Sequence, residues 1–178
     1  MSELIALAWE DINLDKGIIR ARRARVKGDF KLPKTQGSIR TIHLIRPAYE
    51  TLSNQLNLSS QLSKREIKVT QSDNKTIKSE YVRFVFLNSK NLMPHFSEGT
   101  FRDRFFKTHL KKAEIRYRPP GQARHTYASQ LLTAGVNERW IANQMGHQNI
   151  KMLEKHYGKW MESEAPNIIK SVEIALDL

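Results

Sequence analysis

The sequence predicts an α+β fold that is mainly helical and carries a small antiparallel β-sheet. Two strand-like segments near the N-terminus are joined by turn-forming residues, whereas several later segments repeat apolar residues at helical spacing. Strands and helices do not alternate in the way that indicates a parallel sheet. The chain has 178 residues, enough for a sizeable core, and we expect residues 1–178 to form one compact domain.

The N-terminal part of the chain contains the predicted sheet. A short apolar helix over 4–8 is followed by strands over 18–26 and 39–44. Residues 27–30 and 35–38 supply turn chemistry between these strands. We therefore expect the two strands to form an antiparallel hairpin.

The strand predicted over 18–26 is charged on both faces. Because side chains alternate along a strand, Arg20 and Arg22 point to one face while Arg23 and Arg25 point to the other. Such a strand does not suit the centre of a core. A basic ribbon lying against DNA and a solvated edge strand both explain the pattern.

The middle of the chain is predicted to hold two helices and a further strand. A helix over 47–62 leads into a polar stretch over 59–80, which we expect to be a loop or an interrupted helix. Alternation over 81–87 predicts a short strand. Ser97 suits the N-cap of the next helix. The phenylalanines of that helix recur at helical spacing and are expected in the core: Phe101, Phe105 and Phe106.

The last third of the chain is expected to be helical throughout. Residues 119–121 interrupt the chain before a helix that Gly135 ends. Asn137 is expected to cap the next helix and Gly146 to close it. Two more helices are predicted after that turn, over 150–156 and 166–176.

Charge and composition favour a polyanionic partner. Lys and Arg number 30 against 18 acidic residues, a net charge of +12, so nucleic acid is the first expectation and an anionic membrane the second. A soluble basic protein is the plain alternative. The sequence contains no cysteine, which excludes disulfides and a thiol nucleophile. No apolar run approaches roughly 18 residues and no signal peptide is evident, so we expect a cytoplasmic protein.

Three short motifs stand in fixed order near the C-terminus. They are RHTYAS at 124–129, Gly146-His147 and Tyr157-Gly158, with 23 positions from the arginine to the second histidine and 10 more to the tyrosine. Helix-like segments separate them. Over about the last third of the chain, this pattern resembles the second half of the active site of the tyrosine recombinases, the phage integrase family.

The resemblance implies site-specific strand exchange on double-stranded DNA. In that family a tyrosine attacks a DNA phosphodiester and forms a 3′-phosphotyrosyl intermediate with a free 5′-hydroxyl. Tyr157 would be the nucleophile, and Arg124 and His147 would stabilise the phosphate. The intermediate retains the bond energy, so neither a cofactor nor a metal is expected. A DNA-binding remnant without catalysis and a type IB topoisomerase are the alternatives, and the short motif spacing favours an integrase over a topoisomerase.

The chemistry of these side chains supports the implied roles. A tyrosine with an ordinary pKa of about 10 needs help to lose its proton. Arg124 offers a permanently charged fork near a helix N-terminus, which suits phosphate oxygens that gain charge. His147 can donate a hydrogen bond to the same phosphate. Each residue alone would have an ordinary structural role, so the prediction rests on their joint occurrence.

Further site residues are assigned by the resemblance. In the family a lysine on a β-hairpin gives a proton to the leaving 5′ oxygen, and Lys34 matches that position, although Lys27 and Lys31 lie on the same hairpin. Phosphate contacts are expected from five basic side chains: Arg20, Arg22, Lys34, Arg40 and Arg124.

The sequence departs from the family pattern in two places. Gly121 stands where the family has a histidine three residues before Arg124, so one proton-handling group is missing or replaced. The first catalytic arginine would fall before Met1, although Glu3 matches the acidic residue that supports it. We therefore expect a nearly inactive fragment that lacks an N-terminal core-binding domain. His125 is expected to point to the other side of its helix, in a supporting structural role.

The remaining expectations concern assembly and competing chemistries. A tetramer on DNA is implied for a full-length protein and a monomer for the isolated domain. An apolar stripe over 168–176 would dock on a neighbouring protomer or pack against its own domain. The sequence has no glycine-rich phosphate loop and no histidine–carboxylate spacing typical of metal sites. Ser129 with His125 lacks the nucleophile elbow of a hydrolase triad.

Overall fold

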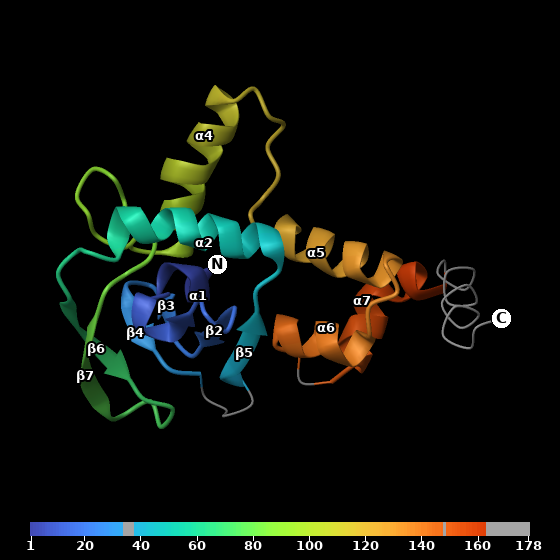
Figure 1. The fold of residues 1–178 in the computed structure, drawn as a ribbon, viewed down its shortest axis with the longest axis horizontal. Coiled ribbons are helices and arrows are strands. Elements are labelled where there is room, and N and C mark those ends of the chain that lie inside the picture. Colours follow the sequence, from blue (N-terminus) through green and yellow to red (C-terminus); the bar gives the residue numbers. More distant parts are fainter. Residues whose placement is uncertain (34–37, 148, 163–178) are drawn as a thin grey trace. The chain divides into compact units, whose positions relative to one another are not determined.

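The computed structural model describes residues 1–33, 38–147 and 149–162. The chain divides into two compact units, Met1–Tyr117 and Arg118–Leu178. The first unit combines helices with two small sheets, and the described part of the second is built from helices (Figure 1). The predicted α+β class is confirmed.

The three-stranded sheet of the first unit has the order β1–β2–β5 and is antiparallel throughout. Its strands are β1 (Ile12–Asn13), β2 (Ile18–Ala21) and β5 (Arg40–His43). Ile19 of β2 lies opposite Ile42 of β5. The expected antiparallel pairing of two N-terminal strands is therefore confirmed for β2 and β5.

The prediction of one continuous strand over 18–26 is wrong. The chain leaves the first sheet after Ala21 and enters a second sheet at Ala24. Arg22 and Arg23 lie between the two strands, and their guanidinium groups bind carboxylates inside the unit. Two of the four arginines assigned to one strand therefore lie at the junction between two sheets, while Arg20 lies on β2 and Arg25 on β3.

The four-stranded sheet has the order β3–β4–β6–β7. Its strands are β3 (Ala24–Val26), β4 (Asp29–Lys31), β6 (Arg65–Thr70) and β7 (Ile77–Val82). β4 and β6 run parallel, with Phe30 opposite Val69, while the other two pairs are antiparallel. The expectation of a purely antiparallel sheet is corrected at this pair, because β5 and a long helix between β4 and β6 return the chain in the same direction.

Strands β6 and β7 occupy a stretch for which the sequence predicted a loop or an interrupted helix. On β6, Ile67 and Val69 are buried, whereas Glu66 and Lys68 are exposed. This is the alternation of a strand with one buried face, and the many polar residues belong to its solvent face. β7 covers only the start of the strand expected over 81–87.

Three helices of the first unit precede or cover these strands. They are α1 (Ser2–Ile5), the 3₁₀ turn η1 (Trp9–Asp11) and α2 (Arg46–Ser59). Pro47 stands in the first turn of α2, where its missing N–H has no intrahelical partner to lose. The helix expected over 47–62 is confirmed, and it ends before the predicted limit.

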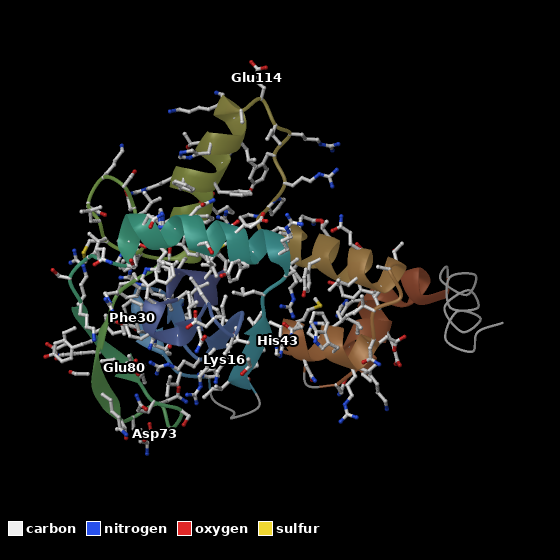
Figure 2. All side chains as sticks on the ribbon, in the orientation of Figure 1. Lys16, Phe30, His43, Asp73, Glu80 and Glu114 are labelled. Atoms are coloured by element: carbon white, nitrogen blue, oxygen red, sulfur yellow. The ribbon has the colours of Figure 1, made fainter. Side chains whose placement is uncertain are left out.

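Two buried clusters hold the first unit together. Leu52 of α2 packs with Leu7, Trp9 and Val85, next to apolar residues of the three-stranded sheet. The second cluster lies at the four-stranded sheet and consists of Ala6, Ala8, Phe30, Ile67, Val69, Val82 and Phe84. Figure 2 shows Phe30 within the unit and Asp73 at its margin.

The last helical segment of the first unit differs from the prediction in its burial. It consists of α3 (Glu98–Thr100), the π-helical η3 (Phe101–Phe106) and α4 (Lys107–Lys112). The Ser97 side chain accepts a hydrogen bond from the Thr100 amide, so the predicted N-cap is confirmed. None of the three phenylalanines is buried; the Phe101 and Phe105 rings stack with centroids 5.3 Å apart. A π-helix shifts side chains away from regular helical spacing, which explains why the core prediction fails here.

The second unit packs three helices around its own core. They are α5 (Gln122–Thr133), α6 (Glu138–Met145) and α7 (Lys151–Glu162). Asn137 caps α6 by accepting from the Trp140 amide, as predicted. Gly135 and Gly146 adopt left-handed φ values of 69° and 71° after α5 and α6, a conformation that glycine adopts without strain. The helix expected over 166–176 lies outside the described residues.

Across the described ranges, no helix is both long and apolar enough to cross a membrane.

Candidate active site

Arg124 lies in the first turn of α5 and reaches the end of α6. Its Nη2 donates a hydrogen bond to the backbone oxygen of Met145 at 2.7 Å. Carbonyls in the last turn of a helix lack intrahelical partners, and a cation there also complements the helix dipole. The contact therefore holds the guanidinium group beside the turn that follows α6.

That turn positions His147. Gly146 ends α6 in the left-handed conformation, and the His147 amide donates to the Ala142 oxygen at 2.9 Å. His147 is therefore two positions after Met145, whose backbone oxygen accepts the hydrogen bond from Arg124. The helix end brings the predicted arginine and histidine segments together.

Tyr157 lies on α7 with only 3% of its surface exposed. Its ring belongs to a buried cluster with Ala128, Leu132, Ile141, Met145 and Leu153. The phenol oxygen lies 2.8 Å from His125 Nδ1, and the centroids of the two rings are 5.6 Å apart. The apolar body of the tyrosine is therefore fixed by packing, while its hydroxyl is held by an imidazole.

The surroundings of the Tyr157 phenol have opposite effects on its proton. Burial raises the pKa of Tyr157 above the ordinary value, because the charged phenolate is poorly solvated there. The positive charge of Arg124 lowers this pKa but does not outweigh burial. The phenol is therefore held in its protonated form and needs a group that accepts the proton before it can act as a nucleophile.

The position of His125 corrects the prediction that it points away from the site. α5 packs against both α6 and α7. Arg124 meets the end of α6, and the next side chain, about 100° further round the helix, meets Tyr157 of α7. His125 is itself exposed, so its ring contacts the buried phenol while part of it reaches solvent.

In the first unit, Glu3 and Arg40 form a bidentate ion pair. Arg40 Nη1 and Nη2 donate to the two carboxylate oxygens of Glu3 at 2.9 and 2.8 Å. Glu3 was expected to support an arginine of the site, and the arginine that it binds within the described residues is Arg40. Arg20 is exposed on β2. Lys34 lies outside the described residues.

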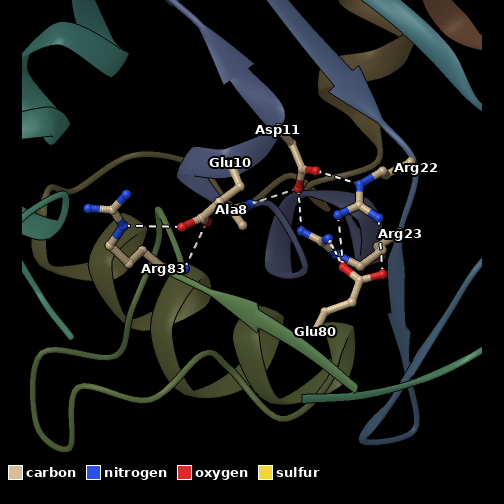
Figure 3. Close-up of polar contacts among 7 residues, drawn as sticks. All are labelled: Ala8, Glu10, Asp11, Arg22, Arg23, Glu80 and Arg83. Carbon is tan, nitrogen blue, oxygen red and sulfur yellow. Dashed lines mark hydrogen bonds and ion pairs between the residues drawn. The ribbon is translucent and has the colours of Figure 1, made fainter. Parts of the chain in front are cut away.

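The same unit contains an ionic cluster made of Asp11, Arg22, Arg23 and Glu80 (Figure 3). Arg22 donates to Asp11 at 2.7 Å and to both oxygens of Glu80 at 3.0 and 2.8 Å. Arg23, whose side chain is 1% exposed, binds the same two carboxylates. The Arg22 guanidinium is engaged inside the protein, which argues against the phosphate contact expected of it.

The acidic members of the ionic cluster were not identified from the sequence. Glu80 is 58 positions from Arg22, so no local spacing relates the two residues. Only the pairing of strands brings them together. Within the described ranges, no group of three or more His, Asp or Glu side chains could hold a metal ion.

The sequence matches the phage integrase family over residues 1–163. It is 41% identical over 165 residues to the putative defective protein IntQ and 40% identical over 165 residues to the prophage integrase IntR, both of Escherichia coli K12. These matches cover 89% and 90% of the chain but only 41% and 40% of the two relatives. The chain therefore spans about two-fifths of their length.

Solved structures share the fold. A Tn1549 transposon integrase in complex with circular intermediate DNA superposes with a TM-score of 0.67 at 23% identity, over 88% of this chain and 49% of that one. XerA recombinase gives 0.59 at 20% identity, over 86% and 44%. The family match spans both units of the chain, and the Arg124, His147 and Tyr157 segments meet in the second. The chain therefore belongs to the phage integrase family, the family of tyrosine recombinase catalytic domains.

Proposed function

We propose that this chain cuts and rejoins duplex DNA at specific sites through a 3′-phosphotyrosyl intermediate. The observation that carries the proposal is the meeting of Arg124, His125 and Tyr157 where α5 packs against α6 and α7. The Tyr157 oxygen attacks the phosphorus, the bond to the 5′ oxygen breaks, and Arg124 and His147 stabilise the charge on the non-bridging oxygens. Rejoining is the reverse reaction with a different 5′-hydroxyl.

Duplex DNA is the proposed substrate and a tetramer on DNA the proposed working assembly. The net charge of +12 supports DNA binding, and the related Tn1549 integrase was solved in complex with DNA. Arg20 and Arg124 are proposed phosphate contacts, and Lys34 is the proposed donor of a proton to the leaving oxygen. The Arg40 guanidinium, like that of Arg22, is engaged by a carboxylate, which argues against the phosphate contact expected of it. Neither strand transfer nor rejoining requires a cofactor, because the bond energy stays in the phosphotyrosyl ester.

A non-catalytic DNA-binding remnant is the second candidate function. Two observations favour it: the relative IntQ is described as a putative defective protein, and the Tyr157 side chain is almost completely buried. This candidate predicts DNA binding without a covalent step.

A covalent trapping experiment separates the two candidates. The substrates are nicked duplexes with a randomised sequence around the nick. Cleavage near the nick releases a short strand that carries the 5′-hydroxyl, so rejoining is prevented and the covalent protein–DNA adduct accumulates. We expect the wild-type chain to form the adduct slowly, in keeping with the nearly inactive fragment that the sequence predicts, and Tyr157→Phe, which keeps the ring and its packing, to form none. DNA binding by both proteins without any adduct would favour the remnant. An adduct of normal yield in Tyr157→Phe would contradict the assignment of the nucleophile.

A further inference from the structure

A hydrogen-bond contact between His125 and the Tyr157 phenol oxygen joins two helices of the second unit. The oxygen lies 2.8 Å from Nδ1, within the range for hydrogen bonding, and the ring planes are inclined by 48°. The partners are 32 positions apart in sequence, so the contact depends on the packing of α5 against α7.

We propose that His125 is a catalytic residue whose Nδ1 accepts the phenol proton when the Tyr157 oxygen attacks DNA. The role rests on the proposed function, because it requires Tyr157 to be the nucleophile. In this step the phenol O–H bond breaks, an Nδ1–H bond forms, and the oxygen electron pair makes the new bond to phosphorus. The 5′ oxygen leaves with the electrons of the broken P–O bond and takes its proton from a separate donor, the role predicted for Lys34.

The placement of His125 suits proton transfer. The phenol is buried, whereas His125 is exposed, so its ring connects a sequestered hydroxyl with solvent. After Nδ1 accepts the proton, the Nε2 proton can pass to water and restore the neutral ring. An imidazole is the side chain best matched to proton transfer near neutral pH. Position 121, one turn earlier on the same helix, offers no side chain that could take this role.

Other ionisable groups face the Tyr157 phenol or lie on the helices packed around it. Burial keeps the phenol protonated, the Arg124 charge favours its ionisation, and the His156 ring lies 6.4 Å from the Tyr157 ring between centroids. Among the described side chains, the further ionisable groups on α5, α6, α7 and the turn after α6 are Tyr127, Glu138, Arg139, His147, Lys151, Glu154 and Lys155.

The tautomer of His125 tests the proposal without DNA. We expect ¹⁵N NMR of the 178-residue chain at neutral pH to show His125 with a bare Nδ1 and a protonated Nε2. In Tyr157→Phe, which has no hydroxyl to donate, the population of this tautomer should fall. A protonated Nδ1 in the neutral wild-type ring would overturn the proposal, because His125 would then donate to the tyrosine oxygen.

Two substitutions then separate proton transfer from positioning in the trapping experiment. His125→Asn can still bond to the phenol but cannot take its proton, and His125→Phe keeps the ring without nitrogens. We expect both to slow adduct formation about 10²–10⁴-fold at neutral pH. The loss should shrink as pH rises and the phenol ionises without help. His156→Asn makes the same chemical change one residue from the nucleophile and should leave the rate near that of the wild type.

Each other outcome has a distinct meaning. A wild-type rate in His125→Asn would reduce His125 to a positioning residue and overturn the proposed proton transfer. Faster reaction in both variants would mean that the contact restrains the tyrosine, which also overturns it. No adduct with the wild type, or an adduct that persists in Tyr157→Phe, would contradict the proposed function itself.

Discussion

The molecule holds arginine side chains in two different ways. In the ionic cluster of the first unit, Arg22 and Arg23 share two carboxylates, so four charges cancel within the protein. In the second unit, Arg124 donates to the backbone oxygen of Met145, and this acceptor is neutral rather than a carboxylate. The first arrangement is suited to joining strands and the second to binding an anion.

The largest expected effect breaks the ionic cluster. Arg23→Ala leaves Asp11 and Glu80 with one partner fewer, and removing one member of a buried ion pair typically costs about 3–5 kcal/mol. Arg83→Ala is the matched control, because the Arg83–Glu10 pair is more exposed, and pairs of that kind contribute about 0–1 kcal/mol. The free energy of unfolding in urea, followed by circular dichroism, measures both. Equal losses of unfolding free energy in the two variants would show that burial does not distinguish the two ion pairs.

The next largest effect is expected at Arg124, the arginine that binds a backbone oxygen. Arg124→Ala should lower the rate of adduct formation by about 10²–10³, because it removes a preorganised donor to the phosphate. Arg124→Lys keeps a charge but not the fork and should recover only part of the rate. Arg139→Ala, on the exposed side of α6, serves as the control and should react normally. A normal rate in Arg124→Ala would remove the contrast between the two regions.

The turn after α6 gives a smaller, paired prediction. Gly146→Ala and Gly135→Ala both place a β-carbon on a left-handed residue, which costs roughly 1–2 kcal/mol of folding free energy. Only Gly146→Ala disturbs the turn that carries His147, so only this variant should also slow adduct formation beyond its loss of stability. Similar slowing in both variants would mean that the turn has no special relation to the site.

The smallest effects are changes of stability with pH, and the two regions should respond at opposite ends of the scale. Burial alone would raise the pKa of Glu80, but hydrogen bonds from Arg22 and the charge of Arg23 outweigh it and hold the pKa below its ordinary value of 4.5. The stability that Glu80 contributes is present above pH 4.5 and is lost as pH falls through the lower folded value. Glu80→Gln should flatten the acid limb of the stability curve.

For Tyr157 the sign is reversed. Burial raises the pKa above its ordinary value of 10.0, so the stability that this phenol contributes is present below pH 10 and is lost as pH rises through the higher folded value. Tyr157→Phe should therefore flatten the alkaline limb and leave the acid limb unchanged. Amide hydrogen exchange of each unit, measured as a function of pH, assigns the two limbs. If both units lost stability at the same end of the pH range, the contrast between the two regions would be contradicted.

Local signals in the sequence were sufficient for some features and insufficient for others. Asn137 and Gly146 were predictable as caps because capping depends on neighbours within one turn. The Arg124, His147 and Tyr157 segments were recognisable because their motifs resemble those of the phage integrase family. The direction of His125 was not, since it depends on the packing of α5 against both other helices.

Long-range pairing explains the remaining errors. Ile67 and Val69 lie in a polar stretch, and their burial depends on the pairing of β6 with β4 and β7. The parallel pairing of β4 with β6 had no local signature either. The acidic partner of Arg22 could be found only after the strands had been placed.

The parallel pair also bears on how the chain folds. Phe30 meets Val69 only after the intervening segment has closed as a loop, and the bond from Arg22 to Glu80 spans 58 positions. The second unit instead depends mainly on helices that form from neighbouring residues. Because non-local contacts slow folding while local ones speed it, we expect the helices of the second unit to form faster than the first unit folds. During synthesis, the part of the chain that is made first would then be the part that is completed last.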